Sequence, residues 1–296
     1  MVARGLRLGL AVQALGVAVC AFLLARFAGL SPGTAAALSF AALLGVYLLF
    51  TVATFAICWP RAHAVPEQNI GFLPACRAII TEWLAFIALF AVIQPFADSV
   101  FSVTGARRRT EKLPVMLVHG YRCNSGLWWW MIARLRAVGF AAEAIDLEPA
   151  LVSIDRFAEQ LHHAIEACLA DTGAGKLRLV THSMGGLVAR AYLQRYGSQR
   201  VDKVITLACG HHGTRIARLG LGKNAREMEQ GSAWLASLPE PPPVPVMTVW
   251  TAQDNFIAPQ TSSRLSGAQE FVLSGMGHLT LMFSPRVLDI VLKTLR

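Results

Sequence analysis

The sequence L-V-T-H-S-M-G-G at residues 179–186 is the most informative stretch of the chain. Its apolar first half is typical of a buried strand, and from Met184 onward the pattern is helical until Gly197, which ends the helix. Ser183 is therefore predicted to lie on a tight turn between strand and helix, with its hydroxyl above the sheet and near the positive end of the helix. Gly185 suits this turn because the two backbones come close together there.

The same stretch matches the pattern G-x-S-x-G with one departure, because Thr181 stands where the first glycine is usual. By itself an S-x-G-G sequence also fits an ordinary strand–helix turn that carries no chemistry. The rest of the chain decides between these two interpretations.

Residues 113–296 alternate between strand and helix patterns. Strands are predicted at residues 114–118, 140–146, 176–180, 203–207, 244–250 and 270–273, and helices at 126–137, 153–170, 184–196 and from 284 onward. Such alternation requires crossover connections, so the fold class is α/β with a doubly wound, mostly parallel sheet. Residues 210–243 are expected to form a small cap with one amphipathic helix around residues 226–238.

Two further polar residues follow predicted strands, at the edge where a parallel sheet gathers its functional groups. Asp254 follows the strand at 244–250, and His278 follows the strand at 270–273. The order Ser183, Asp254, His278 is the order in which nucleophile, acid and base occur along such a chain.

The first strand ends at H-G-Y, residues 119–121. An oxyanion hole can form at this point. The backbone N–H groups of Tyr121 and of Met184, which follows the candidate nucleophile, are predicted to hold the oxygen of a tetrahedral intermediate.

With these residues in place, the sequence resembles the α/β-hydrolase superfamily and, within it, bacterial triacylglycerol lipases and esterases. The likeness covers residues 113–296. It rests on V-H-G-Y at 118–121, H-S-M-G-G at 182–186, H-H-G-T at 211–214 and G-M-G-H-L at 275–279. The resemblance implies that Ser183 is the nucleophile, His278 the general base and then acid, and Asp254 the group that orients His278. It also implies chemistry without a cofactor, and no residues suggest ligands for the structural calcium that some members bind.

The tryptophans at 128–130 lie beside the candidate oxyanion loop. Consecutive helical residues point about 100° apart, so all three cannot face one core, and at least one is expected to be exposed. Trp128 and Trp129 are therefore candidates for an acyl pocket or for contact with a membrane surface. The alternative is that two are buried and one is exposed without a function.

Other polar residues are weaker candidates. Asp202 begins a strand and so lies at the wrong end of the sheet. His211 and His212 have no carboxylate or cysteine partner at a spacing useful for a metal, so a structural role near the rim of the site is expected. The six cysteines include no C-x-x-C pair and no zinc or disulfide pattern.

The N-terminal third differs in composition from the rest. Only 15% of the chain is charged and 54% is apolar or aromatic, against about 25% charged in ordinary soluble domains. Apolar runs at residues 8–25, 34–59 and 78–96 suit membrane helices, so residues 1–105 are predicted to form an anchor. The third run holds Glu82 and either spans with this side chain snorkelling or lies in the interface. A cleaved signal peptide is the alternative for the first run, but a second apolar run follows it directly.

The net charge of +9, from 27 Lys and Arg against 18 Asp and Glu, favours membrane lipids as partners, and no motif or aromatic-basic face suggests nucleic acid. Two spans would place the domain on the side of the N-terminus, which the positive-inside rule predicts to be cytoplasmic. Three spans would place it on the opposite side. If the chain spans the membrane twice, one side of the membrane carries the basic residues Arg4, Arg7, Arg61, Arg77 and Arg107–Arg109.

We therefore expect an integral protein of the bacterial inner membrane, a serine hydrolase that cleaves carboxylic esters and above all lipid acyl esters. A phospholipase or an acyl-thioesterase with the same triad is one alternative. A non-catalytic membrane scaffold that keeps the hydrolase fold is an alternative of another class. The oligomeric state stays open.

Overall fold

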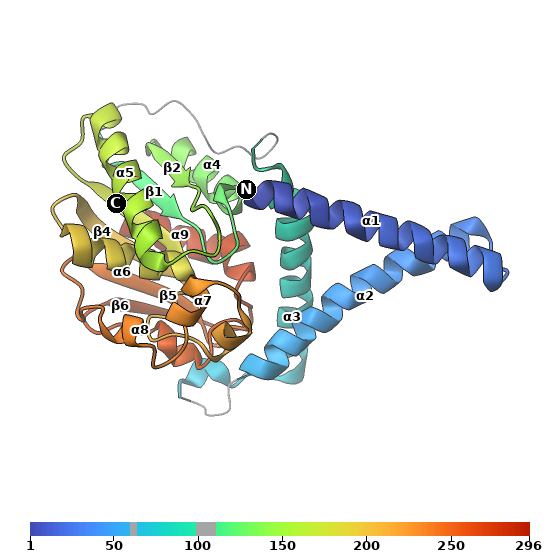
Figure 1. Cartoon of the computed structure of the whole chain (residues 1–296). Helices are drawn as coiled ribbons and strands as arrows, with labels where there is room; N and C mark the ends of the chain where they lie inside the picture. Colours follow the sequence, from blue (N-terminus) through green and yellow to red (C-terminus); the bar gives the residue numbers. More distant parts are fainter. Residues whose placement is uncertain (60–63, 99–110) are drawn as a thin grey trace.

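The computed structural model describes residues 1–59, 64–98 and 111–296 of the chain. The basic residues Arg61 and Arg107–Arg109, which bear on membrane orientation, lie outside these ranges. The described part consists of an α/β domain and three long N-terminal helices (Figure 1).

In the described part of the chain, a six-stranded sheet with only parallel neighbours forms the centre of the domain, as the alternating pattern predicts. Its strands are β1 (Val115–Val118), β2 (Ala142–Ile145), β3 (Leu177–His182), β4 (Val201–Leu207), β5 (Val246–Thr251) and β6 (Gln269–Leu273). They lie in the order β2-β1-β3-β4-β5-β6, so the direction of winding reverses between β1 and β3. Ligands of such sheets bind outside the carboxyl ends of the strands at this reversal.

Helices cover both faces of the sheet. α5 (Ile154–Thr172) and α6 (Met184–Tyr196) pack into the core on one face. α4 (Trp129–Ala137) and α9 (Pro285–Thr294) pack into the core on the other. The predicted start of α5 is confirmed, because the Ser153 side chain caps its first turn.

The cap differs from the prediction. Instead of one amphipathic helix around residues 226–238, it holds two short helices, α7 (Lys223–Glu227) and α8 (Ala233–Ala236). A single helix over residues 226–238 cannot pass through Gly231, which adopts a left-handed φ of 77°. Ser232 then caps a new helix by accepting a hydrogen bond from a backbone N–H in its first turn.

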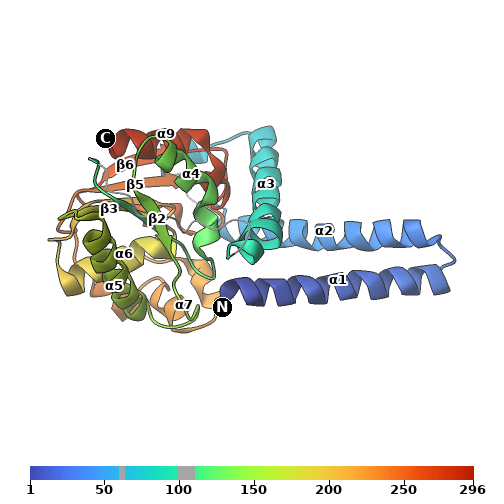
Figure 2. The ribbon, with the colours of Figure 1, turned by 90° about the horizontal axis from the view of Figure 1, so that it is seen from above.

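The N-terminal region is a helical hairpin followed by a third helix. α1 (Val2–Phe27) and α2 (Pro32–Cys58) project away from the domain and meet at their far ends (Figures 1 and 2). α3 (Phe72–Ile87), continued by irregular helical turns as far as Phe96, lies between this hairpin and the domain, across the direction of α1 and α2. All three are long and apolar enough to cross a membrane.

One face of α3 and its continuation belongs to the core of the domain. Ala85, Leu89 and Ile93 lie in the same hydrophobic cluster as α4 and α9. Glu82, on the same face, is only 1% exposed. The snorkelling position predicted for Glu82 in a spanning helix is therefore wrong, because α3 turns this carboxylate into the domain and not toward headgroups.

Candidate active site

Ser183 occupies the turn between β3 and α6 in a strained conformation. Its φ of 54° and ψ of −126° lie in a region that residues with a side chain rarely adopt. The turn carries α6 so close to β1 that a Cβ on Gly185 would lie 2.4 Å from the carbonyl oxygen of Val118. A Cβ on Gly120 would lie 2.9 Å from Cβ of Ser183, so the loop after β1 runs directly against the serine.

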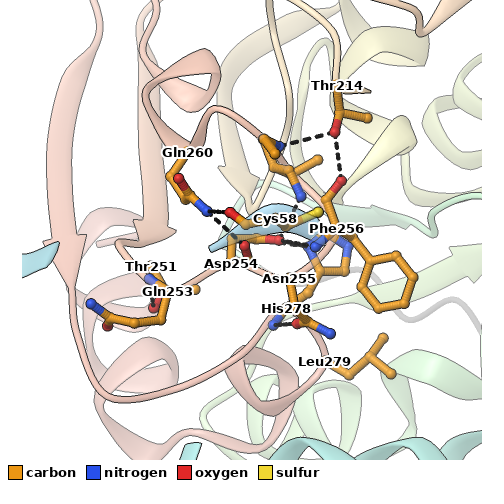
Figure 3. A network of polar contacts seen from close by, with 12 residues as sticks. Cys58, Thr214, Thr251, Gln253, Asp254, Asn255, Phe256, Gln260, His278 and Leu279 are labelled. Atoms are coloured by element: carbon orange, nitrogen blue, oxygen red, sulfur yellow. Dashed lines mark hydrogen bonds and ion pairs between the residues drawn. The ribbon is translucent and has the colours of Figure 1, made fainter. Parts of the chain in front are cut away.

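His278 and Asp254 form a buried pair beyond the ends of β5 and β6 (Figure 3). Nδ1 of His278 lies 2.8 Å from Oδ2 and 3.0 Å from Oδ1 of Asp254. Oδ1 also accepts hydrogen bonds from the backbone N–H groups of Phe256 and Ile257, both at 2.8 Å, which fixes the carboxylate. Nδ1 of His278 therefore carries the proton and donates it to the carboxylate, leaving the lone pair on Nε2.

Two carboxylates and a second imidazole set the charge of His278. Burial opposes its charged form, but Asp254, by charge and hydrogen bond, and then Glu82 outweigh this and raise the pKa of His278 above its ordinary value. The ring of His182 lies 4.6 Å from that of His278, centroid to centroid. Burial, followed by the charge of His278, lowers the pKa of His182 well below its ordinary value, so this neighbour is neutral.

The two residues predicted for the oxyanion hole lie at the reversal point of the sheet. Within the described ranges, no protein hydrogen bond is found to the backbone N–H of Tyr121 or of Met184. His119 shapes the loop before Tyr121, because its Nδ1 donates to the carbonyl of Gly120 at 2.9 Å and its Nε2 accepts the N–H of Leu147 at 3.0 Å. One donor and one acceptor nitrogen require the neutral imidazole, and burial lowers the pKa of His119 accordingly.

The cap contacts both residues of the predicted oxyanion hole, Tyr121 and Met184. The hydroxyl of Tyr121 donates to the carbonyl of Leu221 at 2.7 Å and accepts the N–H of the same residue at 2.8 Å. Nδ2 of Asn224, in α7, lies 3.5 Å from Sδ of Met184. The cap thus holds the two sides of the predicted oxyanion hole together.

Comparison with known proteins agrees with this architecture. Residues 114–238 match the palmitoyl protein thioesterase family. The match covers less than half of the chain and includes Ser183, but it ends before Asp254 and His278.

Among solved structures, the mature form of the lipase BlEst2 from Bacillus licheniformis is similar, with a TM-score of 0.58 and 18% identity over 65% of this chain and 96% of the lipase. Lipase B of Aspergillus fumigatus has a TM-score of 0.57 and 20% identity over 62% of this chain and 52% of its own. The strand order and the shared topology decide the fold. The domain has the α/β-hydrolase fold.

The hydrolase domain is joined to α2 through the loops that carry its candidate acid and base (Figure 3). Oγ1 of Thr54 accepts a hydrogen bond from Nδ2 of Asn255 at 2.9 Å, and Oδ1 of Asn255 accepts the N–H of His278 at 3.0 Å. The carbonyl of Cys58 accepts a hydrogen bond from Nε2 of Gln260 at 2.6 Å, and the same amide donates to the carbonyl of the candidate acid at 2.9 Å. The end of α2 therefore supports the loop after β5 directly and the loop of His278 through Asn255.

α3 and its continuation reach the hydrolase domain at two further points. The Glu82 carboxylate accepts the N–H of Leu279 at 2.9 Å and the N–H and hydroxyl of Thr280 at 2.9 and 2.8 Å. The side-chain oxygen of Gln94 accepts the N–H of Asn124 at 2.8 Å, and its carbonyl accepts from Nδ2 of Asn124 at 2.8 Å. Asn124 lies just after the predicted oxyanion loop.

Sequence patterns alone predict no role in the site for Glu82, Gln94 or Thr54. A signal did exist for Glu82, because an ionisable residue inside an apolar run is a functional candidate by default. Its partner could not be found from the sequence, since 197 residues separate Glu82 from Leu279.

The tryptophans are less accessible than predicted. Trp128 is fully buried in the core with α4, and Trp129 and Trp130 are half-buried against the same cluster. The expectation that at least one is exposed is wrong, since the segment after α3 packs against the turn at Ser125–Trp128. Trp128 offers no free surface to a substrate, and Trp129 offers only part of one.

The residues judged weaker candidates lie where a structural role suits them. Asp202 sits in β4 and pairs with Nε of Arg178 at 2.7 Å. His211 is buried, with Nε2 3.1 Å from the hydroxyl of Thr206. Thr181, at the place of the usual glycine, is buried, and its hydroxyl donates to a β4 carbonyl at 3.3 Å.

Proposed function

We propose that the chain is a membrane-anchored serine hydrolase that cleaves carboxylic esters through Ser183, His278 and Asp254. One observation carries the proposal. The hydrogen-bonded pair of His278 and Asp254 lies at the same edge of the sheet as the strained turn that holds Ser183, and the ring of His182, the residue before the serine, lies 4.6 Å from that of His278. A nucleophile, a base and a group that orients the base are the parts of a serine hydrolase.

In the first half of the reaction, Nε2 of His278 takes the proton of the Ser183 hydroxyl while the serine oxygen attacks the substrate carbonyl carbon. The N–H groups of Tyr121 and Met184 stabilise the oxyanion that forms. Asp254 stabilises the imidazolium without taking its proton. When the intermediate collapses, the bond to the leaving oxygen breaks, His278 gives its proton to that oxygen, and an acyl-serine is left.

In the second half, His278 removes a proton from water while the water oxygen attacks the acyl-serine carbonyl. The same two N–H groups hold the second oxyanion. Collapse returns the proton to the Ser183 oxygen and releases the carboxylic acid, so the enzyme is regenerated with no cofactor.

The contacts of the site favour lipid-borne acyl substrates. Helices of the N-terminal region touch the loops after β5 and β6 through Thr54, Cys58 and Glu82. The reactive edge of the sheet therefore faces the base of the α1–α2 hairpin. A substrate whose acyl chain lies in a bilayer reaches this edge without crossing bulk water.

The membrane placement follows from helix lengths and directions. α1 and α2 have 26 and 27 residues, about 40 Å at 1.5 Å per residue, which spans a hydrocarbon core of about 30 Å. The start of α1 lies against the domain, where the N–H of Val2 donates to Glu148 at 3.0 Å, and Arg7 pairs with Asp98, just after the continuation of α3, at 2.9 Å. In this proposal the hairpin crosses the bilayer and α3, which runs across it, lies at the membrane surface.

Exposed apolar side chains support that surface. Phe72 and Leu73 of α3 are 79% and 77% exposed, and Leu219 and Leu221 of the cap are 71% and 62% exposed. The turn that ends at Leu219 contacts α2, so the cap leucines lie beside the hairpin. Large apolar groups gathered at one side of a domain are typical of a membrane-binding face.

A thioester is the second candidate substrate, because residues 114–238 match the palmitoyl protein thioesterase family. The same triad would act, with sulfur in place of oxygen as the leaving atom. Full-length protein in liposomes should be assayed with p-nitrophenyl esters of increasing chain length and with a palmitoyl thioester, using Ser183→Ala as the control. We expect a higher kcat/KM for the long-chain ester than for the short-chain esters or for the palmitoyl thioester. A higher kcat/KM for the thioester would show that the enzyme is a thioesterase. If the fluorophosphonate does not label Ser183, the chain is better explained as a non-catalytic membrane scaffold.

A further inference from the structure

The carboxylate of Glu82 is enclosed by the loop that carries His278. It accepts three hydrogen bonds from residues 279–280, and it lies where a Cβ on Gly277 would come within 2.5 Å of its Cδ. The residues on both sides of His278 are therefore in contact with one side chain of α3. Glycine is required at 277 because any side chain would displace this carboxylate.

The partners of Glu82 are all donors. Two are backbone N–H groups and one is the hydroxyl of Thr280, and both carboxylate oxygens accept at least one of them. This is the pattern of an acceptor-only carboxylate, although burial raises the pKa of Glu82 above its ordinary value and the hydrogen bonds from residues 279–280 and the charge of His278 only partly offset this. Charge-assisted bonds of this kind are about twice as strong as neutral ones, so they hold the loop firmly.

The ring of His278 depends on this loop for its position. Its Nδ1 is held by Asp254 and its backbone N–H by Asn255, both on the loop after β5. On the opposite side the chain runs straight into the two residues that Glu82 binds. Removal of Glu82 would leave the 277–280 loop without its partner in α3, and His278 would be held by the β5 loop and by contact with the His182 ring.

We propose that Glu82 is a positioning residue of the active site, which fixes the 277–280 loop and through it the orientation of His278. This inference rests on the proposed function, because it gives Glu82 a role only if His278 is the base. It makes α3 part of the catalytic apparatus, beyond its role as an anchor.

The charge of Glu82 also acts on His278. The groups that face the imidazole are Asp254 from the β5 loop, Glu82 from α3 and the neutral His182 from the end of β3. Glu82 contributes to the raised pKa of His278. Loss of this negative charge therefore lowers the pKa of His278, and the acid limb of the rate profile moves to lower pH.

The test compares Glu82→Gln, which keeps the length and removes the charge, with Glu82→Asp, which keeps the charge and shortens the side chain. Glu159→Gln is the matched control, since Glu159 pairs with Arg156 on the outside of α5. Full-length proteins in liposomes are first labelled with a fluorophosphonate, alongside wild type and Ser183→Ala. The values of kcat and KM for a p-nitrophenyl ester are then measured across the pH range in which His278 titrates.

We expect kcat to fall on the order of ten- to a hundredfold in both Glu82 variants with little change in KM, because a displaced base slows chemistry more than binding. The acid limb should move to lower pH in Glu82→Gln and stay in place in Glu82→Asp. The control should match wild type in both respects.

The outcomes separate this inference from the proposed function. A wild type that does not label overturns both. A wild type that labels only at Ser183, together with Glu82 variants of normal kcat and an unmoved acid limb, overturns the role of Glu82 alone, even if their Tm falls. If Glu82→Gln does not fold, Glu82→Asp decides, because a normal kcat in that variant contradicts the positioning role.

Discussion

Nδ1 of His278 lies 2.8 Å from Oδ2 of Asp254, and the same carboxylate is fixed by two backbone N–H groups of its own loop. This contact determines which imidazole nitrogen carries the proton. Because Nδ1–H faces the carboxylate, Nε2 is the nitrogen with a lone pair. The pair therefore makes His278 able to accept a proton at one defined atom.

Replacement of the nucleophile is the first test of the site. Ser183→Ala should lower kcat by about 10⁴-fold or more and abolish fluorophosphonate labelling, because no other group supplies the attacking oxygen. The control is the labelling of wild type in the same liposomes. An Ala variant that still turns over the ester at the wild-type rate would contradict the assignment of Ser183.

The acid can be tested by a change that keeps its shape. Asp254→Asn should lower kcat by about 10⁴-fold, because an amide stabilises the wrong tautomer of His278. Asp202→Asn is the matched control, since Asp202 pairs with Arg178 at the opposite edge of the sheet and should keep its activity. Equal activities of the two variants would argue against Asp254 as the acid.

The pH dependence follows from the raised pKa of His278. His278 must be neutral to accept the serine proton, so kcat/KM should be full above this raised pKa and fall as the pH drops through it. The residual activity of Asp254→Asn should show an acid limb at lower pH, because loss of the neighbouring charge lowers the pKa of His278. A pH–rate profile of kcat/KM checks the sign, and a limb that moves upward would refute it.

The close approach at the serine turn predicts a strict need for glycine. Gly185→Ala should lower the free energy of unfolding by about 1–3 kcal/mol, because its Cβ would lie 2.4 Å from the carbonyl oxygen of Val118. Gly175→Ala is the control, because no heavy atom lies within 4 Å of a Cβ at that position. Thermal unfolding in detergent should show a lower Tm for the first variant only.

Membrane topology distinguishes two spans from three. If α1 and α2 cross the bilayer and α3 lies at its surface, the two ends of the chain lie on the same side of the membrane. Epitope tags placed at both ends should then be either both digested or both protected when protease is added outside sealed vesicles. The side is expected to be cytoplasmic, because Arg4, Arg7 and Arg77 lie on it. Tags protected on opposite sides would show that α3 also crosses the membrane.

Much of the hydrolase domain could be predicted from local signals. α6 runs from Met184 to Tyr196, the limits that its pattern and Gly197 predict, and the strands occur where apolar runs end in turns. The structure of the cap was harder to predict, because Gly231 interrupts a pattern that is typical of one amphipathic helix. The tryptophan prediction was wrong for a different reason, since the distant segment after α3 packs against the turn at Ser125–Trp128 and Trp128 is buried there.

The secondary-structure elements, their alternation and the order of the candidate nucleophile, acid and base can be read from the sequence, because these depend on periodicity and on residues close in the chain. The contacts of Glu82 in α3 with the loop of His278 and of α2 with Asn255 are seen only in the folded chain. Periodicity reports that a face is buried, but it carries no information about which group meets that face. The hydrogen-bond donor of Glu82 at Leu279 is 197 residues away in the chain and belongs to the domain.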